Sequence, residues 1–339
     1  MKNKKEDNKK METGKVRELA TRAAFGDAIL ALGRKDKRIV ALSADLAEST
    51  KVSGFAKEFP DRFFQIGIAE QNMMNIAAGL STTGKIPFVA TFSIFATGRA
   101  WEQMRTAVCY AKMNVKIIGS HSGLSNGGDG ASHQALEDIA ITRVIPNLKV
   151  IVPCDYVEAV KAVIEASKTE GPVYIRLSRD ASPVITRETT RFRIGDAEVF
   201  RIGKDVSIIA CGKMVAIALD AAEELKKESI YAGVINLHTI KPIDSKTILN
   251  AAKETGAIVT AEEHQIHGGM GSAVLEVLAE SSNPVLVAMV GVKDRFGQSG
   301  KTPELMKEYG LSKDDIKKAV REVMKKKNQK AGSQRNIYI

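Results

Sequence analysis

One carboxylate, Glu70, stands in the segment Gly67-Ile68-Ala69-Glu70-Gln71-Asn72, at the start of a stretch rich in Met, Ile and Ala. An acid in the first turn of a helix can simply complement the helix dipole, which contributes about 0.3–1 kcal/mol. A buried acid among apolar neighbours can instead hydrogen-bond a ligand and handle a proton. This segment alone leaves both interpretations open.

Two phenylalanines, Phe92 and Phe95, follow a β-rich run at residues 87–91. Such a pair usually belongs to the core, but it can also form a platform on which a planar ring stacks. An acid and a stacking aromatic at neighbouring strand ends would suit an aminopyrimidine.

A glycine-rich segment, residues 119–134, holds Asp129 and two of the five histidines, His121 and His133. Glycines let the backbone approach a ligand closely. An Asp and two His in a loop have no established metal-ligand spacing, so we expect no metal ion held by this chain. We favour binding of sugar hydroxyls and proton transfer.

Arg22 and Arg179 are the candidate anion-binding residues. A guanidinium forms forked hydrogen bonds to phosphate, although a surface ion pair is its commoner fate. The sequence has no Walker loop and no GxGxxG segment followed by a ribose-binding acid. Another chain would therefore have to supply most of the phosphate site of any phosphorylated cofactor.

These residues lie along an alternation of β-rich runs and helical patterns in the first half of the chain. Strands are predicted at residues 38–42, 87–91, 115–119, 150–152 and 173–177, with helices near 17–30, 69–83, 97–112, 133–143 and 155–169. This βαβ pattern predicts a parallel sheet covered by helices on both faces. Ligands of such sheets bind beyond the carboxyl ends of the strands, where the candidate residues gather.

A second series of the same kind follows. Strands are predicted near 206–211, 231–236, 257–261 and 285–290, with helices near 214–228, 244–254, 270–281, 303–309 and 312–326. The predicted fold class is α/β, with two consecutive domains, each a mostly parallel sheet flanked by helices. We expect a basic disordered tail (1–14), a first domain (15–183), a linker (184–203), a second domain (204–325) and a basic tail (326–339).

The net charge of +10 over 339 residues comes mostly from the two ends. Residues 1–10 carry +3 and residues 325–339 carry +5, which leaves +2 for the body. We therefore expect no nucleic-acid face on the fold. No apolar run is long enough for a membrane span, no apolar leader is visible, and the three cysteines are typical of reduced residues, so we expect a cytoplasmic protein.

Taken together, the segments GIAEQN, TFSIF, GGDGASHQ and LSR resemble the C-terminal half of transketolase, in the form in which that enzyme is split into two polypeptides. The resemblance runs from about Val16 to about Lys325 and covers a pyrimidine-binding and a C-terminal domain. Gly128-Asp129-Gly130 resembles the start of a thiamine diphosphate motif, but its Asn-rich continuation is missing. A diphosphate-binding domain is thus expected on a partner chain.

The resemblance implies a role for each cofactor residue. Glu70 would contact the aminopyrimidine ring of thiamine diphosphate and promote its imino tautomer. Phe92 and Phe95 would pack on that ring, and Asp45 would lie near the cofactor and the subunit contact. Where the family often has a tyrosine three residues after the second phenylalanine, this chain has Gly98.

The resemblance also implies the substrate residues. The sugar phosphate would be held by Arg22, Ser49, His121 and Arg179. Asp129 and His133 would bind hydroxyl groups of the donor and acceptor sugars and assist proton transfer. The catalytic set that the resemblance implies is Glu70, His121, Asp129 and His133. His264 and His267, in the second domain, more often serve assembly than catalysis.

The implied function is that of a transketolase C-terminal subunit, which transfers a two-carbon ketol unit from a ketose phosphate to an aldose phosphate. The implied cofactors are thiamine diphosphate and a Mg²⁺ or Ca²⁺ ion held mainly by an N-terminal partner subunit, and self-association to a dimer is expected. His121 and Arg179 favour this function over a 1-deoxyxylulose-5-phosphate synthase-like enzyme. A 2-oxo-acid dehydrogenase β subunit and a non-catalytic binding subunit remain alternatives.

Overall fold

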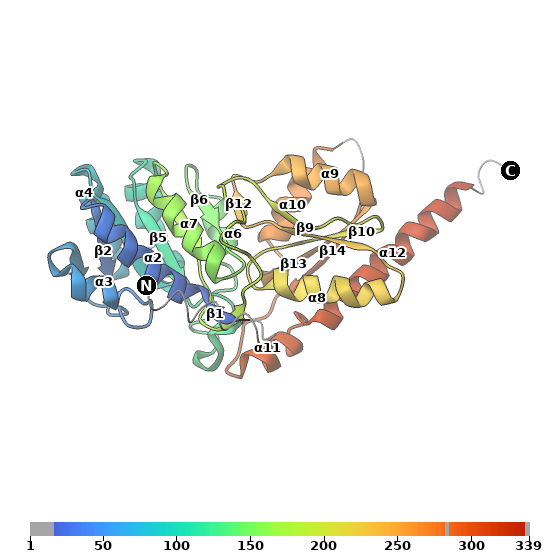
Figure 1. Cartoon of the computed structure of the whole chain (residues 1–339), viewed down its shortest axis with the longest axis horizontal. Helices are drawn as coiled ribbons and strands as arrows, with labels where there is room; N and C mark the ends of the chain where they lie inside the picture. The colour runs from blue at the N-terminus through green and yellow to red at the C-terminus, as the bar shows by residue number, and fades with distance from the viewer. Residues whose placement is uncertain (1–16, 282–284, 336–339) are drawn as a thin grey trace.

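The structure is a computed structural model that describes residues 17–281 and 285–335. Two sheets, each flanked by helices, lie along the long axis of the molecule, and the last helix projects from the far end (Figure 1). The predicted α/β class with two mostly parallel sheets is confirmed. In the part of the chain described, no helix is both long and apolar enough to cross a membrane.

The first sheet has the strand order β12-β6-β7-β5-β4-β2-β3. Its strands are β2 (Ile39–Ser43), β3 (Phe63–Gln65), β4 (Ile86–Phe92), β5 (Lys116–Ser120), β6 (Lys149–Ile151), β7 (Val173–Arg176) and β12 (Thr239–Lys241). All pairings are parallel except that of β12 with β6. The central strands are buried throughout because helices cover both faces of the sheet.

The helices of the first domain divide between these two faces. They are α2 (Thr21–Lys35), α3 (Ser53–Glu58), α4 (Glu70–Thr82), α5 (Trp101–Gln103), α6 (Asp138–Arg143) and α7 (Tyr156–Lys168). Two π-helical turns, η3 (Phe95–Arg99) and η4 (Met104–Tyr110), flank α5. Side chains of α2, α3 and α7 share one core, while those of α4 and η4 belong to another that continues into the second domain.

The second sheet has the order β14-β13-β10-β11-β9, and only β9 runs antiparallel to its neighbour. Its strands are β9 (Glu198–Arg201), β10 (Val206–Ala210), β11 (Ala232–Asn236), β13 (Ala257–Gln265) and β14 (Leu286–Val292). Its helices are α8 (Met214–Lys227), α9 (Ser245–Thr255), α10 (Met270–Ala279), α11 (Thr302–Glu308) and α12 (Lys313–Arg335).

The two halves of the chain interleave more than the sequence predicts. The expected linker, residues 184–203, contains β9, an edge strand of the second sheet. Strand β12 comes from the second half but pairs with β6 of the first sheet. A short antiparallel pair, β1 (Glu18–Ala20) with β8 (Ala181–Pro183), joins the ends of the first domain.

The C-terminal segment is helical further than the sequence predicts. Residues 326–335, expected as part of a basic tail, continue α12, and Lys327 Nζ donates to the carbonyl oxygens of Asp205 and Thr255. These two bonds hold the helix against the second domain. The expected tail at residues 1–14 lies outside the described residues.

Candidate active site

The carboxyl ends of β4 and β5 bring the candidate residues to one edge of the first sheet. Phe92, the last residue of β4, is the register partner of Ser120, and His121 follows directly. The start of α2 lies beside the end of β7, because Arg22 N donates to Ser178 O and Ser178 N to Thr21 Oγ1. These contacts explain why residues far apart in sequence meet.

Glu70 begins α4 and is buried, with 4% of its surface exposed. Its carboxylate accepts hydrogen bonds from Arg99 Nη1, at 3.1 Å to Oε1 and 3.3 Å to Oε2. The Arg99 guanidinium also lies 3.9 Å from the centroid of the Phe95 ring, a cation–π distance. A cavity of about 480 Å³ opens here, lined by residues 68–72 and Arg99.

Arg99 is a site residue that the sequence analysis missed. It ends the π turn η3, whose wider winding turns it back toward the start of α4. Its carbonyl accepts a hydrogen bond from Gln71 Nε2 at 3.0 Å. No feature of the sequence indicated this role, because the position of Arg99 depends on the π turn.

Aromatic rings form a continuous stack between the two ends of the site. Phe92 lies nearly parallel to Phe95, with ring centroids 5.7 Å apart, and the His121 ring stacks on Phe92 at 3.9 Å. His133 meets Phe95 edge-on at 5.3 Å. The two phenylalanines and both loop histidines therefore form one group of rings.

His121 is neutral and held in a fixed orientation. Burial, reinforced by the neighbouring Arg22 cation, lowers the pKa of His121 to about 3. Its Nε2 accepts from Arg22 Nη1 at 3.2 Å, which assigns the proton to Nδ1, 2.8 Å from Ser120 Oγ. The residue has a φ of 58°, a strained conformation for a non-glycine residue that is common at functional sites.

The two candidate anion-binding arginines lie close together. Burial lowers the pKa of Arg22, and the positive charge of Arg179 lowers it further. Arg22 Nη1 donates to Ser49 O at 3.0 Å, but its buried Nε has no hydrogen-bond partner among the described residues. Arg179 Nη1 donates to Asn126 O at 2.8 Å and to Asp129 Oδ2 at 3.1 Å. Neighbouring guanidiniums with an unmet donor are suited to a bound anion.

Two predicted residues, Ser49 and Asp45, make backbone rather than side-chain contacts here. Ser49 meets Arg22 through its backbone carbonyl, so the described contact does not use its hydroxyl. Asp45 is exposed, has a φ of 61°, and donates its backbone N–H to Gln65 Oε1. No described hydrogen bond joins Asp45 to Glu70.

His133 also differs from expectation in its local structure. The predicted helix at 133–143 begins only at Asp138. Residues before it are held in a turn, because Gly130 has a positive φ and Ala135 forms a bridge with Ser122. His133 is therefore a loop residue, half-buried, with Nδ1 2.9 Å from Ser132 Oγ.

The acid–histidine group of the second domain makes its described hydrogen bonds mainly to the backbone. Residues 262–264 lie within β13 and are buried. Glu262 accepts from the backbone N–H groups of Met270 and Gly271, and burial raises the pKa of Glu262 to about 7. His264 Nε2 accepts from Ala140 N, while burial lowers the pKa of His264 to about 4. His267 is exposed.

The donor set fits an aminopyrimidine better than a metal ion. Within residues 17–281 and 285–335, no group of three or more His, Cys, Asp or Glu side chains could hold a metal ion. The three cysteines are free and buried. A buried carboxyl beside a parallel aromatic pair is the environment that a flat, hydrogen-bonding ring needs. A planar ring stacked on Phe95 would meet the Arg99 guanidinium, which already lies there. Either both groups pack on Phe95 or Arg99 moves aside when the ring binds.

Comparison with known proteins agrees with this arrangement. Residues 17–184 match the family model described as transketolase, pyrimidine binding domain, and residues 195–316 match transketolase, C-terminal domain. The chain is 47% identical to a putative transketolase C-terminal section of Methanocaldococcus jannaschii, over 90% of this chain and 96% of that protein. It is 43% identical to a 6-deoxy-6-sulfo-D-fructose transketolase subunit of Clostridium sp. (strain MSTE9), over 93% and 97%.

A solved structure shows the same likeness in three dimensions. It is described as a split gene transketolase, an inactive β4 tetramer, and is 50% identical, with a TM-score of 0.85 over 91% of this chain and 99% of that one. The chain therefore belongs to the transketolase family, of which it carries the pyrimidine-binding and C-terminal domains.

Proposed function

We propose that this chain is the C-terminal subunit of a split, cytoplasmic transketolase that moves a two-carbon ketol unit from a ketose phosphate to an aldose phosphate. The observation that carries the proposal is the line of contacts from Glu70 through Arg99, Phe95, Phe92 and His121 to Arg22. This line joins an acid suited to a pyrimidine with an arginine suited to an anion.

The cofactor residues are those that meet at the first end of this line. Glu70 would hydrogen-bond the aminopyrimidine of thiamine diphosphate, and Phe95 would carry its ring. When bound, the cofactor supplies the nucleophilic carbon and the electron sink that cleavage of a carbon–carbon bond needs. The Mg²⁺ or Ca²⁺ ion and the diphosphate would be held mainly by the partner subunit, since the sequence lacks the Asn-rich continuation of the thiamine diphosphate motif.

The substrate residues lie at the other end. Arg22 and Arg179 would bind the terminal anion of the sugar, with Ser49 and His121 fixing the orientation of Arg22. Asp129 and His133 would contact hydroxyl groups and move protons. Because the described bond of His133 uses Nδ1, its Nε2 is the atom we assign to the substrate.

A partner subunit is supported by the surface around Glu70. The residues of α4 that are exposed here, Gln71, Asn72, Asn75 and Gly79, carry no charge, and Ile68 is 74% exposed. An uncharged helix face beside an open cavity is suited to protein contact. The expected dimer stays a prediction, since the similar solved structure is described as a tetramer of its own chain.

The test is to mix the chain with a candidate N-terminal subunit, thiamine diphosphate and Mg²⁺, and to measure transfer from xylulose 5-phosphate to ribose 5-phosphate. Activity in the mixture and in neither subunit alone supports the proposal. Activity with pyruvate and glyceraldehyde 3-phosphate instead would favour a synthase. A 6-deoxy-6-sulfo-fructose donor belongs in the assay, because an arginine pair can bind a sulfonate as well as a phosphate.

A further inference from the structure

The loop that carries Asp129 and His133, residues 123–134, leans on the second domain. We name these residues the substrate loop. Ser125 N donates to Glu263 Oε1 at 2.6 Å, and Gln134 Nε2 donates to Gln298 O at 3.0 Å. Thr302 Oγ1 donates to the carboxylate of Asp180, the residue after Arg179. The contacts come from two separate parts of the second domain, β13 and residues 296–302.

At three glycines between the substrate loop and the second domain, an added methyl group would displace a side chain on the other side. A Cβ added at Gly123 would lie 2.6 Å from Glu263 Cδ, and one at Gly130 would lie 2.7 Å from Ser299 Oγ. A Cβ added at Gly297 would overlap Gln134 Oε1. The two sides of this contact are therefore close-packed. In a close-packed region, a displacement on one side is transmitted to the other.

The loop needs this external support. Gly123, Gly127 and Gly130 all have positive φ values, and glycine has the largest conformational freedom of any residue. On its outer side, Arg179 donates to Asn126 O and forms an ion pair with Asp129 in which the two side chains are 37% and 41% exposed. Exposed pairs of this kind contribute little to order.

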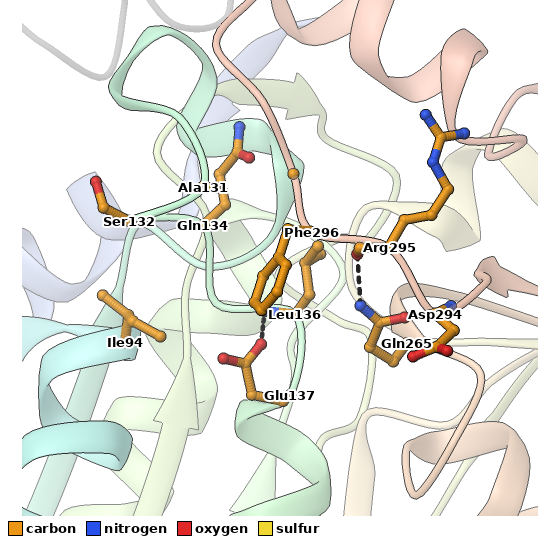
Figure 2. A pocket seen from close by; sticks show the side chains of 11 residues that line it. Ile94, Ala131, Ser132, Gln134, Leu136, Glu137, Gln265, Asp294, Arg295 and Phe296 are labelled. Carbon is orange, nitrogen blue, oxygen red and sulfur yellow. Dashed lines mark hydrogen bonds between the residues drawn. The ribbon is translucent and has the colours of Figure 1, made fainter.

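A cavity beside the loop gives it somewhere to move. The cavity has a volume of about 460 Å³ and lies between the two domains. Figure 2 shows that Ser132 and Gln134 of the first domain line it together with Arg295 and Phe296 of the second. Because the cavity borders residues next to His133, a loosened loop could shift into it without a clash.

We propose that the second domain acts as the positioning unit of the substrate loop, with Gly297, Thr302 and Glu263 as positioning residues for Asp129 and His133. The inference rests on the proposed function for its kinetic part. Its structural part, that residues 296–302 restrict the motion of residues 123–134, holds whatever the substrate is.

The first test is hydrogen exchange of the isolated chain with Gly297→Ala. Exchange of residues 123–134 should become faster, because Gln134 is displaced, while exchange of the α4 peptide stays as in the wild type. Gly54→Ala is the matched control, since its new methyl group meets only Leu30 Cδ2 at 3.9 Å. Unchanged exchange in residues 123–134 of a folded Gly297→Ala protein would overturn the inference.

The second test is kinetic and uses the complex with the partner subunit. Gly297→Ala should lower kcat/KM for sugar transfer by roughly 100-fold, the effect of a displacement of about 1 Å at a reacting group. The Kd of thiamine diphosphate should change far less, because the added Cβ meets neither Glu70 nor Phe95. A general structural defect would weaken cofactor binding as well, and that result would also count against the inference.

Thr302→Val keeps the test decisive if Gly297→Ala does not fold. Loss of one hydrogen bond to a carboxylate should lower kcat/KM by about tenfold. Thr302→Ser, which keeps the hydroxyl, should recover most of this loss. If wild-type complex shows no transfer at all, the proposed function fails, and the exchange experiment alone decides the inference.

Discussion

Arg179→Ala separates binding of the sugar's terminal anion from every other role of this residue. Nη1 of Arg179 is used by Asn126 O and Asp129 Oδ2, which leaves the Nε and Nη2 donors for an anion. A hydrogen bond to a charged group contributes about 1.5–3 kcal/mol. The side chain is 37% exposed, so we take the lower end, about 1.5 kcal/mol for each bond.

One lost bond of that size corresponds to roughly a tenfold fall in kcat/KM, and two to roughly 100-fold. The same substitution also removes the contact with Asp129, which is an exposed ion pair worth at most about 1 kcal/mol. That second loss lowers kcat/KM by up to about fivefold for any sugar, whether or not it carries a phosphate. The ratio of the kcat/KM losses for the phosphorylated and the unphosphorylated sugar therefore isolates the phosphate contact.

The assay compares ribose 5-phosphate with ribose as acceptor, in the complex with the partner subunit. Arg179→Ala should reduce kcat/KM for ribose 5-phosphate about 10–100-fold more than the loss of the Asp129 contact explains. Arg179→Lys should give a kcat/KM between those of the wild type and Arg179→Ala, because lysine keeps the charge but lacks the forked donors of a guanidinium. Equal losses for ribose 5-phosphate and ribose would remove Arg179 from the phosphate site.

Three further predictions concern Glu70, the ion pair at the domain boundary, and Glu262. Glu70→Gln should lower kcat by at least about 100-fold without moving the melting temperature of the chain, and near wild-type turnover with the partner would end its assignment. Arg176→Met should lower the free energy of unfolding by about 3–5 kcal/mol, measured in urea, because it leaves the buried carboxylate of Asp138 unpaired; adding Asp138→Asn should recover much of this loss. Burial raises the pKa of Glu262 from 4.5 to about 7, so between these values the folded chain binds more protons than the unfolded chain and the free energy of unfolding falls as pH rises. Glu262→Gln should flatten that slope in urea titrations between the same two pH values, and an unchanged slope would contradict the cause given.

The regular elements were predictable because their signals are local. The runs at 38–42 and 115–119 are mostly apolar without alternation, as is typical of central parallel strands, and the structure has β2 and β5 there. Strands β9 and β12 were not predicted, although they are as long as β7 and β6, which were. Their existence depends on neighbours supplied by distant parts of the chain, so no window of sequence could reveal them.

The distinction between local sequence signals and contacts from distant parts of the chain applies to the site as well. Glu70 and the pair Phe92 and Phe95 stand in segments whose composition marks them. The bond from Arg22 to His121 joins residues 99 positions apart, and the place of Arg99 depends on a π turn. A π turn has no clear signature in composition, because it differs from an α-helix only in its winding. These contacts needed the three-dimensional structure.

Strand β12 has a consequence for how the polypeptide acquires its structure during synthesis. During synthesis, residues 17–184 leave the ribosome before residues 239–241. Until β12 has emerged, the edge of β6 in the first sheet has no pairing partner there. An unpaired sheet edge can pair with another chain and so promote aggregation. The hydrophobic core that α4 shares with β10, β11 and α10 is also unfinished until the second half emerges. We therefore expect the first half alone to aggregate more readily than the whole chain, because it exposes apolar surface that the second half covers.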